Sequence, residues 1–299
     1  MNSLLDVREL QKVFPLKDGS KIHAVEHVDV EVGHAETLAV VGESGCGKST
    51  LAQLICKLLD ADGGSIKLEG KELTGLSTVQ MRPHRSKMQM IFQDPFASLD
   101  PRRTVGYSVA EPLIIHGLAK KREELRDRVA KLFERVGLLL SHMNQFPHQF
   151  SGGQRQRVCI ARALALAPKL VIADESVSAL DVSVQAQVIN LMMELQRDMG
   201  LSYLFITHDL AVVERMAHRV AVMYLGQIVE MGSRAHIFEN PTHSYTKKLL
   251  QAAPIADPRQ RKERPLLTGE IPSPRWAAGQ SPVRVEHVEI EPGHLVAKE

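Results

Sequence analysis

Gly42-Glu43-Ser44-Gly45-Cys46-Gly47-Lys48-Ser49 is the stretch that decides the fold of this chain. It matches the pattern G-x-x-x-x-G-K-[ST], in which glycines let backbone N–H groups turn towards phosphates, the lysine reaches the β and γ phosphates, and the final hydroxyl ligates magnesium. The apolar run Thr37–Val41 precedes it, and Ser49–Ile55 has helical spacing. A strand, a glycine loop and a helix in this order predict a nucleotide-phosphate site.

The overall composition bounds the possible functions. The 299 residues suffice for one large domain with an appendage or for two compact domains. Lys+Arg number 37 against 35 Asp+Glu, and aromatic residues make up 4%, which argues against an electrostatic or base-stacking nucleic-acid binder. No run approaches the roughly 18 to 20 apolar residues of a membrane span, so we expect any membrane attachment to come from another subunit.

The order of sequence patterns predicts an α/β fold. Residues 4–33 read as an antiparallel β ribbon, and residues 94–166 as an inserted helical subdomain that contains the amphipathic helix Arg122–Val136. Buried strand runs alternate with helices elsewhere, which predicts a parallel sheet covered on both faces. The strand runs are Met88–Phe92, Leu170–Ala173, Tyr203–Thr207 and Val220–Met223, and the helix Val184–Met199 lies between two of them. Past about Asn240 the chain is rich in proline, so we expect little regular structure there.

Two further stretches carry chemistry. Asp174 and Glu175 follow a buried strand, where one carboxylate holds a metal ion and the next polarises an attacking water. Ser151-Gly152-Gly153-Gln154 opens a helix, and such a start leaves N–H groups and a hydroxyl free to face an anion. An apolar run that ends in two acids is a weak pattern alone, and it gains weight from the glycine loop.

These motifs together resemble the ATP-binding cassette (ABC) ATPases, which have a P-loop NTPase (RecA-like) core. The resemblance implies catalytic roles for Glu175, the switch residue His208 and the Q-loop residue Gln93. It implies magnesium held by Ser49, Gln93 and Asp174, and a D-loop that contains Ser178 and Asp181. It also implies that Ser151, Gly152, Gly153 and Gln154 form a signature motif that contacts the ATP of a partner cassette. The implied ATP contacts are Phe14, Gly42, Glu43, Ser44, Gly45, Cys46, Gly47, Lys48, Ser49 and Thr50.

Several stretches resemble the branch that imports dipeptides, oligopeptides or nickel. They are Gln93–Arg102, Phe150 before the signature, Ser178–Gln187, Asn240–Thr246 and Gly269–Pro274. The resemblance implies an ATPase domain over residues 1–240 and a C-terminal extension over residues 241–299. It implies as partners a second ABC ATPase subunit, two integral membrane permease subunits and, indirectly, an extracytoplasmic solute-binding protein, with no nucleic acid. The chain is then expected as a peripheral protein on the cytoplasmic face of the cell (inner) membrane.

The chain departs from this branch at three points. Ser176 and Ser244 stand where prolines are usual in the family. No cysteine follows Cys159, and we therefore expect no iron–sulfur cluster of the kind that some members hold in their C-terminal segment. The three cysteines, Cys46, Cys56 and Cys159, form no C-x-x-C pair, which predicts neither a zinc site nor a disulfide framework. Cys46 lies near Lys48, a setting that could make the loop redox-sensitive, although a tolerated small side chain is the simpler interpretation.

Other interpretations stay open. Phe14 is a residue of the ribbon core in one of them. Arg155, Arg157 and Arg162 are expected on the helix surface and at dimer contacts rather than on a ligand. A soluble cassette ATPase of DNA repair or translation is a second functional class, and a P-loop kinase or GTPase is a third, which leaves the signature motif and His208 unexplained. The importer ATPase is the preferred hypothesis, with ATP held between two half-sites.

Overall fold

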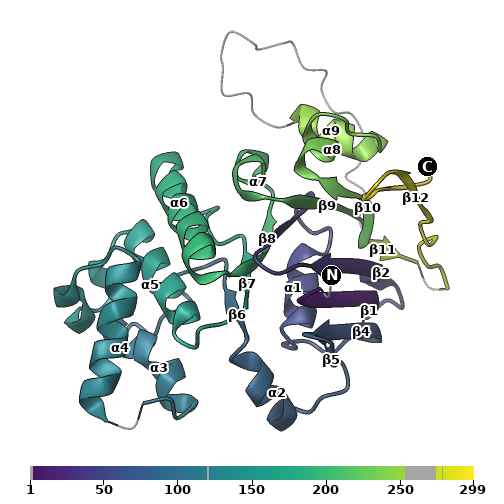
Figure 1. The fold of residues 1–299 in the computed structure, drawn as a ribbon. Helices are drawn as coiled ribbons and strands as arrows, with labels where there is room; N and C mark the ends of the chain where they lie inside the picture. Colours follow the sequence, from purple (N-terminus) through teal and green to yellow (C-terminus); the bar gives the residue numbers. More distant parts are fainter. Residues whose placement is uncertain (1–2, 120, 253–273, 278) are drawn as a thin grey trace.

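The computed structural model describes residues 3–119, 121–252, 274–277 and 279–299. It contains an eight-stranded sheet in the order β12-β13-β10-β9-β3-β8-β7-β6 and a five-stranded sheet in the order β11-β2-β1-β4-β5 (Figure 1). The first comprises β3 (Thr37–Val41), β6 (Met88–Ile91), β7 (Leu170–Asp174), β8 (Ser202–Thr207), β9 (Arg219–Tyr224), β10 (Gln227–Ser233), β12 (His287–Glu291) and β13 (His294–Ala297). The second comprises β1 (Leu5–Pro15), β2 (Lys21–Val32), β4 (Gly63–Leu68), β5 (Lys71–Glu72) and β11 (Arg275–Trp276).

The centre of the large sheet is parallel, as the sequence predicts. β3 pairs in parallel with β8 and β9, and β7 pairs in parallel with β6 and β8. Alternate residues of these strands enter different clusters, because successive side chains of a strand point to opposite faces. Leu204 and Ile206 pack in a hydrophobic cluster with Leu51 and Leu54. Tyr203 and Phe205 pack in a second hydrophobic cluster with Phe133 and Val158. Both faces of the central strands are therefore buried.

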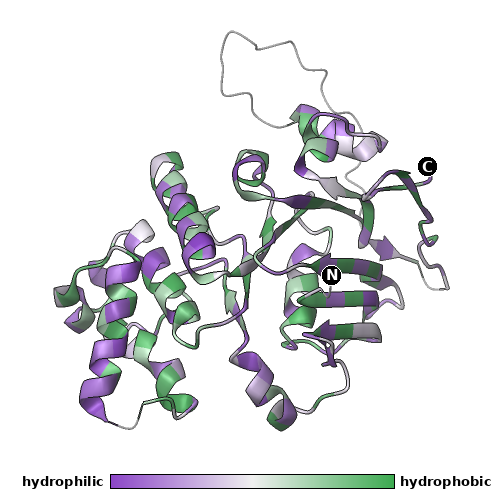
Figure 2. Cartoon of the chain, in the orientation of Figure 1, coloured by the Kyte–Doolittle hydropathy of each residue, from purple (hydrophilic) through white to green (hydrophobic). Residues whose placement is uncertain are grey.

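Helices cover the two faces. Their bounds are α1 (Lys48–Ile55), α2 (Thr78–Arg85), α3 (Val105–Ile115), α4 (Arg122–Arg135), α5 (Gly152–Leu164), α6 (Val182–Met199), α7 (Leu210–Met216), α8 (Arg234–Phe238) and α9 (Ser244–Ala252). Figure 2 shows the central strands in green and much of α4 in purple, with Val129 and Phe133 of α4 buried. The predicted helix Arg122–Val136 is thus confirmed. None of the helices in the described part of the chain has the length and apolar character that crossing a bilayer requires.

The C-terminal extension is more regular than the sequence indicates. The expectation of little regular structure past Asn240 is wrong for the described residues there, which form α9, β11 and the hairpin β12–β13. β13 adds to the edge of β10, and β11 adds to the edge of β2. The strands form because an existing sheet edge supplies their hydrogen bonds, which proline content does not reveal. Residues 269–273 of the stretch Gly269–Pro274 lie outside the described residues.

A charged cluster joins the two sheets. Glu69, in the turn after β4, accepts hydrogen bonds from Lys169 and Lys87, which lie just before β7 and β6. The pKa of Glu69 is lowered to about 2, with the largest contribution from the hydrogen bond of Lys169 and the next from that of Lys87. A folded-state pKa below the unfolded value of about 4.3 stabilises the fold above that value, and this contribution is lost as the pH falls towards 2.

We expect Glu69→Gln to lower the free energy of unfolding by about 1 kcal/mol at pH 7, because the Glu69 side chain is only partly exposed and screening reduces its ion pairs. The difference between variant and wild type should shrink at pH 3, as measured by urea unfolding. Asp60→Asn is the control. It also removes a carboxylate that pairs with a lysine, Lys57, but the Asp60 side chain is 86% exposed. Equal destabilisation at both pH values would contradict this assignment.

Candidate nucleotide site

The candidate site lies where parallel strands end. The phosphate loop follows β3, Glu175 follows β7, His208 follows β8 and Gln93 lies two residues beyond β6. Parallel strands present their carboxyl ends at one edge of a sheet, and ligands bind there in open α/β sheets. The fold therefore gathers, at one edge, side chains that are far apart in the sequence.

The loop fits against β2 so closely that a side chain has no room at Gly47. This glycine precedes α1 with φ 113°, and a Cβ atom there would lie 1.9 Å from the carbonyl oxygen of Ala24. The N–H of Gly226, in the turn after β9, donates to the carbonyl oxygen of Cys46 at 2.9 Å. Two neighbouring strands thus fix the course of the loop.

Lys48 is buried with its ammonium directed into the loop. Its Nζ atom donates to the carbonyl oxygens of Gly42 at 2.8 Å and Glu43 at 2.7 Å. A buried cation is stable only when its donors are satisfied, and these carbonyls satisfy two of the three. Phosphate oxygens are stronger acceptors for an ammonium, so the side chain can exchange the carbonyls for a phosphate.

Ser49 and Asp174 meet at the predicted magnesium position. The Ser49 hydroxyl donates to Oδ1 of Asp174 at 3.0 Å. Asp174 is buried, and this burial raises the pKa of its carboxyl group. A hydroxyl and a carboxylate are oxygen donors of the kind that magnesium takes together with phosphates and water, so these two residues fit that ion.

Glu175 gathers the other two predicted catalytic residues. Its Oε2 atom accepts a hydrogen bond from Nε2 of Gln93 at 2.7 Å, and its Oε1 atom lies 3.3 Å from Nδ1 of His208. Glu175 itself has φ 44°, a left-handed conformation that costs an L-residue about 1 kcal/mol or more. Ser178 of the predicted D-loop holds this turn, because its hydroxyl donates to the Glu175 carbonyl oxygen at 2.8 Å.

A hollow of about 320 Å³ lies between the ribbon and the loop. Phe14, Ile22 and Ala24 line its ribbon side, and Ser44, Gly45, Gly47–Thr50, Gln93 and Glu175 line the rest. None of the signature residues Ser151–Gln154 lines it, and Figure 1 shows α1 and α5 on different sides of β6 and β7. Gly42, Glu43 and Cys46 belong to the loop but do not line the hollow.

The predicted signature motif forms a capped helix start. Ser151 Oγ accepts the N–H of Gln154 at 3.3 Å, and Gln154 Oε1 accepts the N–H of Ser151 at 3.0 Å. The expectation that the Ser151 hydroxyl is free is therefore wrong here, because a serine at this position satisfies the helix's own donors. Gly153 allows α5 to approach α6, since a Cβ atom there would lie 2.3 Å from Cγ1 of Val184. Asp181 of the predicted D-loop caps α6.

Arg155 of α5 turns inward, which corrects the expectation that it lies on the helix surface, whereas Arg157 and Arg162 are only partly buried. Arg155 is 9% exposed, donates to the carbonyl oxygen of Pro147 at 2.7 Å and stacks on Phe96. Arg157 donates to the carbonyl oxygen of Val136, and Arg162 to that of Ser98. Carbonyl groups at turns provide acceptors that a helical pattern does not reveal. Arg155 and Arg162 thus join α5 to the segment that follows Gln93.

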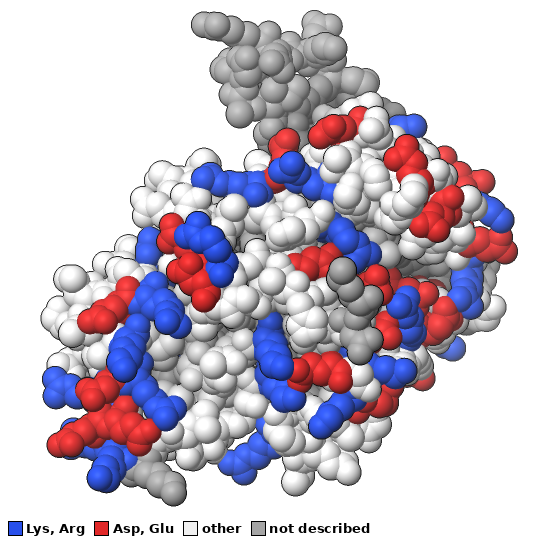
Figure 3. Space-filling model, viewed as in Figure 1, with Lys and Arg blue, Asp and Glu red and all other residues white. Residues whose placement is uncertain are grey.

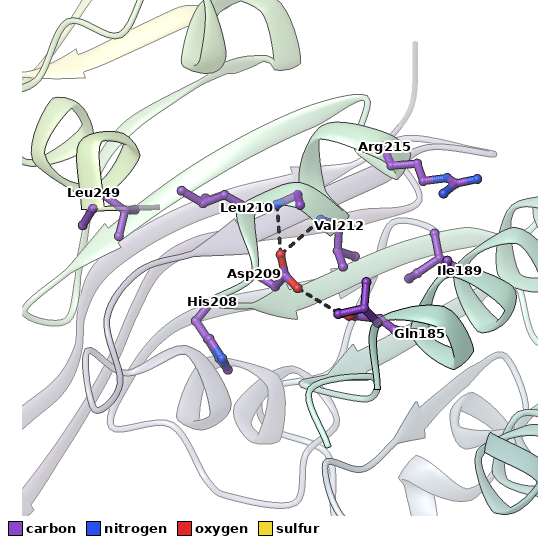
Figure 4. Close-up of a pocket in the computed structure, with 12 residues that line it drawn as sticks. Gln185, Ile189, His208, Asp209, Leu210, Val212, Arg215 and Leu249 are labelled. Atoms are coloured by element: carbon purple, nitrogen blue, oxygen red, sulfur yellow. Dashed lines mark hydrogen bonds between the residues drawn. The ribbon is translucent and has the colours of Figure 1, made fainter. Parts of the chain in front are cut away.

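A second and larger hollow, of about 660 Å³, lies beside His208 between α6, α7 and α9. Figure 4 shows Asp209 between the first turn of α7 and Gln185 of α6. Asp209 accepts the N–H of Ala211 at 3.0 Å and Nε2 of Gln185 at 2.8 Å. These two residues hold the chain just after His208 against α6, and their role was missed by the sequence analysis, although an aspartate just before a helix is a typical cap.

The comparison with known families agrees with this geometry. The model of the ABC transporter family matches residues 25–178, from β2 to Ser178. The chain belongs to the ABC transporter family. Residues 229–279 match a second profile, the C-terminal region of oligopeptide/dipeptide transporters. The family resemblance on which the sequence analysis rests is therefore confirmed.

Curated relatives carry the name glutathione import ATP-binding protein GsiA. The protein of Pectobacterium atrosepticum is 53% identical over 301 residues, which cover 98% of this chain and 48% of the relative. That of Salmonella paratyphi A is 54% identical over 302 residues, which cover 99% of this chain and 48% of the relative. The chain thus spans about half the length of these relatives.

Solved structures share the fold. The ATP-binding cassette MJ0796, in a dimeric post-hydrolysis state bound to ADP and Pi, is 28% identical with a TM-score of 0.71, covering 77% of this chain and 98% of that one. CbiO1 of Clostridium perfringens, part of the ABC transporter complex cbiONQ, is also 28% identical with a TM-score of 0.71. The match covers 80% of this chain and 92% of that one. The predicted P-loop NTPase fold is confirmed.

The surroundings of Cys46 favour the unreactive thiol form of its side chain. Its side chain is buried, and this burial raises the pKa of the thiol, although the Lys48 ammonium opposes the shift. Since the thiolate is the reactive form, we expect iodoacetamide at pH 7.5 to label Cys46 at less than about a tenth of the rate of a free thiol. Mass spectrometry of the peptide measures this rate, with urea-unfolded protein as the control. Rapid labelling that ATP blocks would contradict it.

Proposed function

We propose that this chain is the ATP-hydrolysing subunit of an importer for peptide-like solutes. The observation that carries the proposal is the meeting of Gln93 and His208 on Glu175, beside a phosphate loop whose Lys48 and Ser49 are in place. The match to the C-terminal region of oligopeptide/dipeptide transporters supports the solute class.

Glu175 is the proposed general base. Its carboxylate accepts the proton of a water that attacks the γ-phosphate, and Gln93 and His208 hold the carboxylate from either side. Lys48 binds the β and γ phosphates, and the N–H groups at the start of α1 face them. Ser49 and Asp174 would hold the magnesium ion, which when bound neutralises phosphate charge. Phe14 would stack on the adenine ring.

The site is proposed to be completed by a second cassette. The hollow beside Lys48 does not include the signature residues, and the start of α5 presents backbone N–H groups that attract an anion. In the proposed assembly, Ser151–Gln154 of each subunit contact the ATP held by the other. ATP binding closes the pair, and hydrolysis reopens it.

The proposed partners are two integral membrane permease subunits, with an extracytoplasmic solute-binding protein acting through them. The chain then works as a peripheral subunit at the cytoplasmic face of the cell (inner) membrane. A nucleic-acid machine is disfavoured, because Figure 3 shows acidic and basic side chains intermingled on the visible face rather than a broad basic surface.

Glu175→Gln should leave ATP binding intact and lower kcat by about 10²- to 10⁴-fold, because an amide cannot accept the proton of the attacking water. Phosphate release measures turnover, and a fluorescent ATP analogue measures binding. Glu194→Gln, which alters an exposed carboxylate on α6, is the matched control. Near-normal turnover in Glu175→Gln would reject the assigned base.

Purification from membranes tests the partners. We expect the tagged chain, extracted in mild detergent, to bring down two polytopic membrane proteins, and its ATPase activity to rise when the solute-binding protein and a short peptide are added to the complex. Mass spectrometry identifies the proteins. Recovery of ribosomes or DNA instead would favour the nucleic-acid class.

A further inference from the structure

The stretch Asn240–Thr246 has no role in the mechanism above. It lies within the part of the chain that matches the C-terminal region of oligopeptide/dipeptide transporters. In the structure α9 begins inside this stretch, at Ser244, and its Tyr245 packs in one cluster with Val41 and Val222, the residues near the ends of β3 and β9. The C-terminal extension thus reaches the strand that leads into the phosphate loop.

Tyr245 contacts the loop itself. Its hydroxyl oxygen accepts a hydrogen bond from the backbone N–H of Glu43 at 3.0 Å, and Glu43 is the second residue of the loop. Tyr245 is 8% exposed, and the centroid of its ring lies 4.2 Å from the centroid of the Tyr224 ring. Burial raises the pKa of the Tyr245 hydroxyl, so it remains a neutral phenol at physiological pH.

A buried carboxylate fixes the start of α9. Glu230 of β10 is fully buried, and its oxygens accept the N–H groups of Thr242 at 2.8 Å and His243 at 3.0 Å. Nε2 of the buried His294 lies 2.8 Å from the same carboxylate. His243 in turn accepts the N–H of Tyr245 through Nδ1 at 3.1 Å. Tyr245 is therefore held from the sheet and has little freedom to leave the loop.

The peptide groups of Glu43 are held at both ends. Tyr245 binds its N–H group, and the Lys48 ammonium binds its carbonyl oxygen at 2.7 Å. When Lys48 turns to a phosphate, it gives up this carbonyl, and the contact with Tyr245 remains. Glu43 itself is exposed, but its N–H group donates to the hydroxyl of the buried Tyr245, so this remaining contact keeps the loop in its phosphate-binding shape.

We propose that Tyr245 is a positioning residue of the phosphate loop, through which the C-terminal extension sets the affinity of the site for the triphosphate. The proposal rests on the ATP site of the proposed function and adds a residue outside the loop to it. Tyr245 touches no substrate atom in this role, because it acts through the Glu43 peptide.

Tyr245→Phe tests the proposal, because it removes the acceptor and keeps the ring against Tyr224. We expect the Kd values for ATP and for inorganic tripolyphosphate to rise together by about fivefold to tenfold, the effect of one hydrogen bond, while kcat at saturating ATP changes less than twofold. Tripolyphosphate engages the loop without a base. Phe14→Ala should therefore raise the Kd for ATP and leave the Kd for tripolyphosphate unchanged.

Tyr224→Phe is the matched control, since it removes a hydroxyl from the neighbouring ring. Among the described residues no hydrogen bond joins the Tyr224 hydroxyl to the loop, so both Kd values should stay at the wild-type level. Thermal unfolding of each variant without nucleotide shows whether the fold is kept.

Hydrogen exchange gives a readout that needs no ligand. Peptides that span Glu43 should show a protected Glu43 amide in the nucleotide-free wild type, and at least tenfold faster exchange in Tyr245→Phe than in Tyr224→Phe. A Glu43 amide that exchanges freely in the wild type would overturn the proposal. Unchanged Kd values in Tyr245→Phe, with a wild type that hydrolyses ATP, would also overturn the proposal. That result would leave the proposed function standing. A wild type without ATP binding or hydrolysis overturns both.

Discussion

The parallel direction of β3, β6, β7 and β8 is the constraint on which the candidate site depends. Val41 pairs with Thr207, Asp174 with Ile206, and Ile91 with Ala173, so the four strands end in nearly one row. The alternation along β7 then decides which face each side chain takes. Asp174 shares the face of Leu170 and Ile172, which α1 covers, and this is why it meets Ser49.

Buried charge explains why so many neutral groups surround the loop. Lys48 and Asp174 are 4% and 5% exposed, and each would be unfavourable without partners. Backbone carbonyls satisfy the ammonium, and the Ser49 hydroxyl satisfies one carboxylate oxygen. These partners are all replaceable by phosphate oxygens or a metal ion. The buried charges are therefore stable in these surroundings, and Lys48, Ser49 and Asp174 lie where they would bind ATP and its metal ion.

The sequence predicts well what is local and repetitive. Buried strands such as Leu170–Ala173 and Tyr203–Thr207 were found because apolar runs of this length fit a covered parallel sheet. The candidate residues beside them followed from the ends of those strands, and the family resemblance named their roles. Contacts of high sequence separation could not be found in this way. Nothing near Tyr245 indicates that its hydroxyl meets Glu43, 202 residues away.

Arg155 of α5 shows the same limit. A helix that carries charged residues is typical of a solvated face, and Arg155 would be counted among them. Its guanidinium is nevertheless buried, because a carbonyl oxygen at Pro147 and the ring of Phe96 replace its water. Both partners lie in segments without regular pattern. Only the folded chain shows that this arginine links the signature helix to the segment after Gln93.

Buried polar groups join the C-terminal residues to β10 of the large sheet. Glu230 of β10 accepts hydrogen bonds from the start of α9, and its remaining contact is with His294 of β13. A carboxylate with 0% exposure is tolerable only when these partners are all present. The hairpin β12–β13 therefore stabilises a residue that fixes α9, and α9 in turn reaches the phosphate loop. A stretch that looks like an appendage in the sequence is, by this path of contacts, part of the wall behind the candidate site.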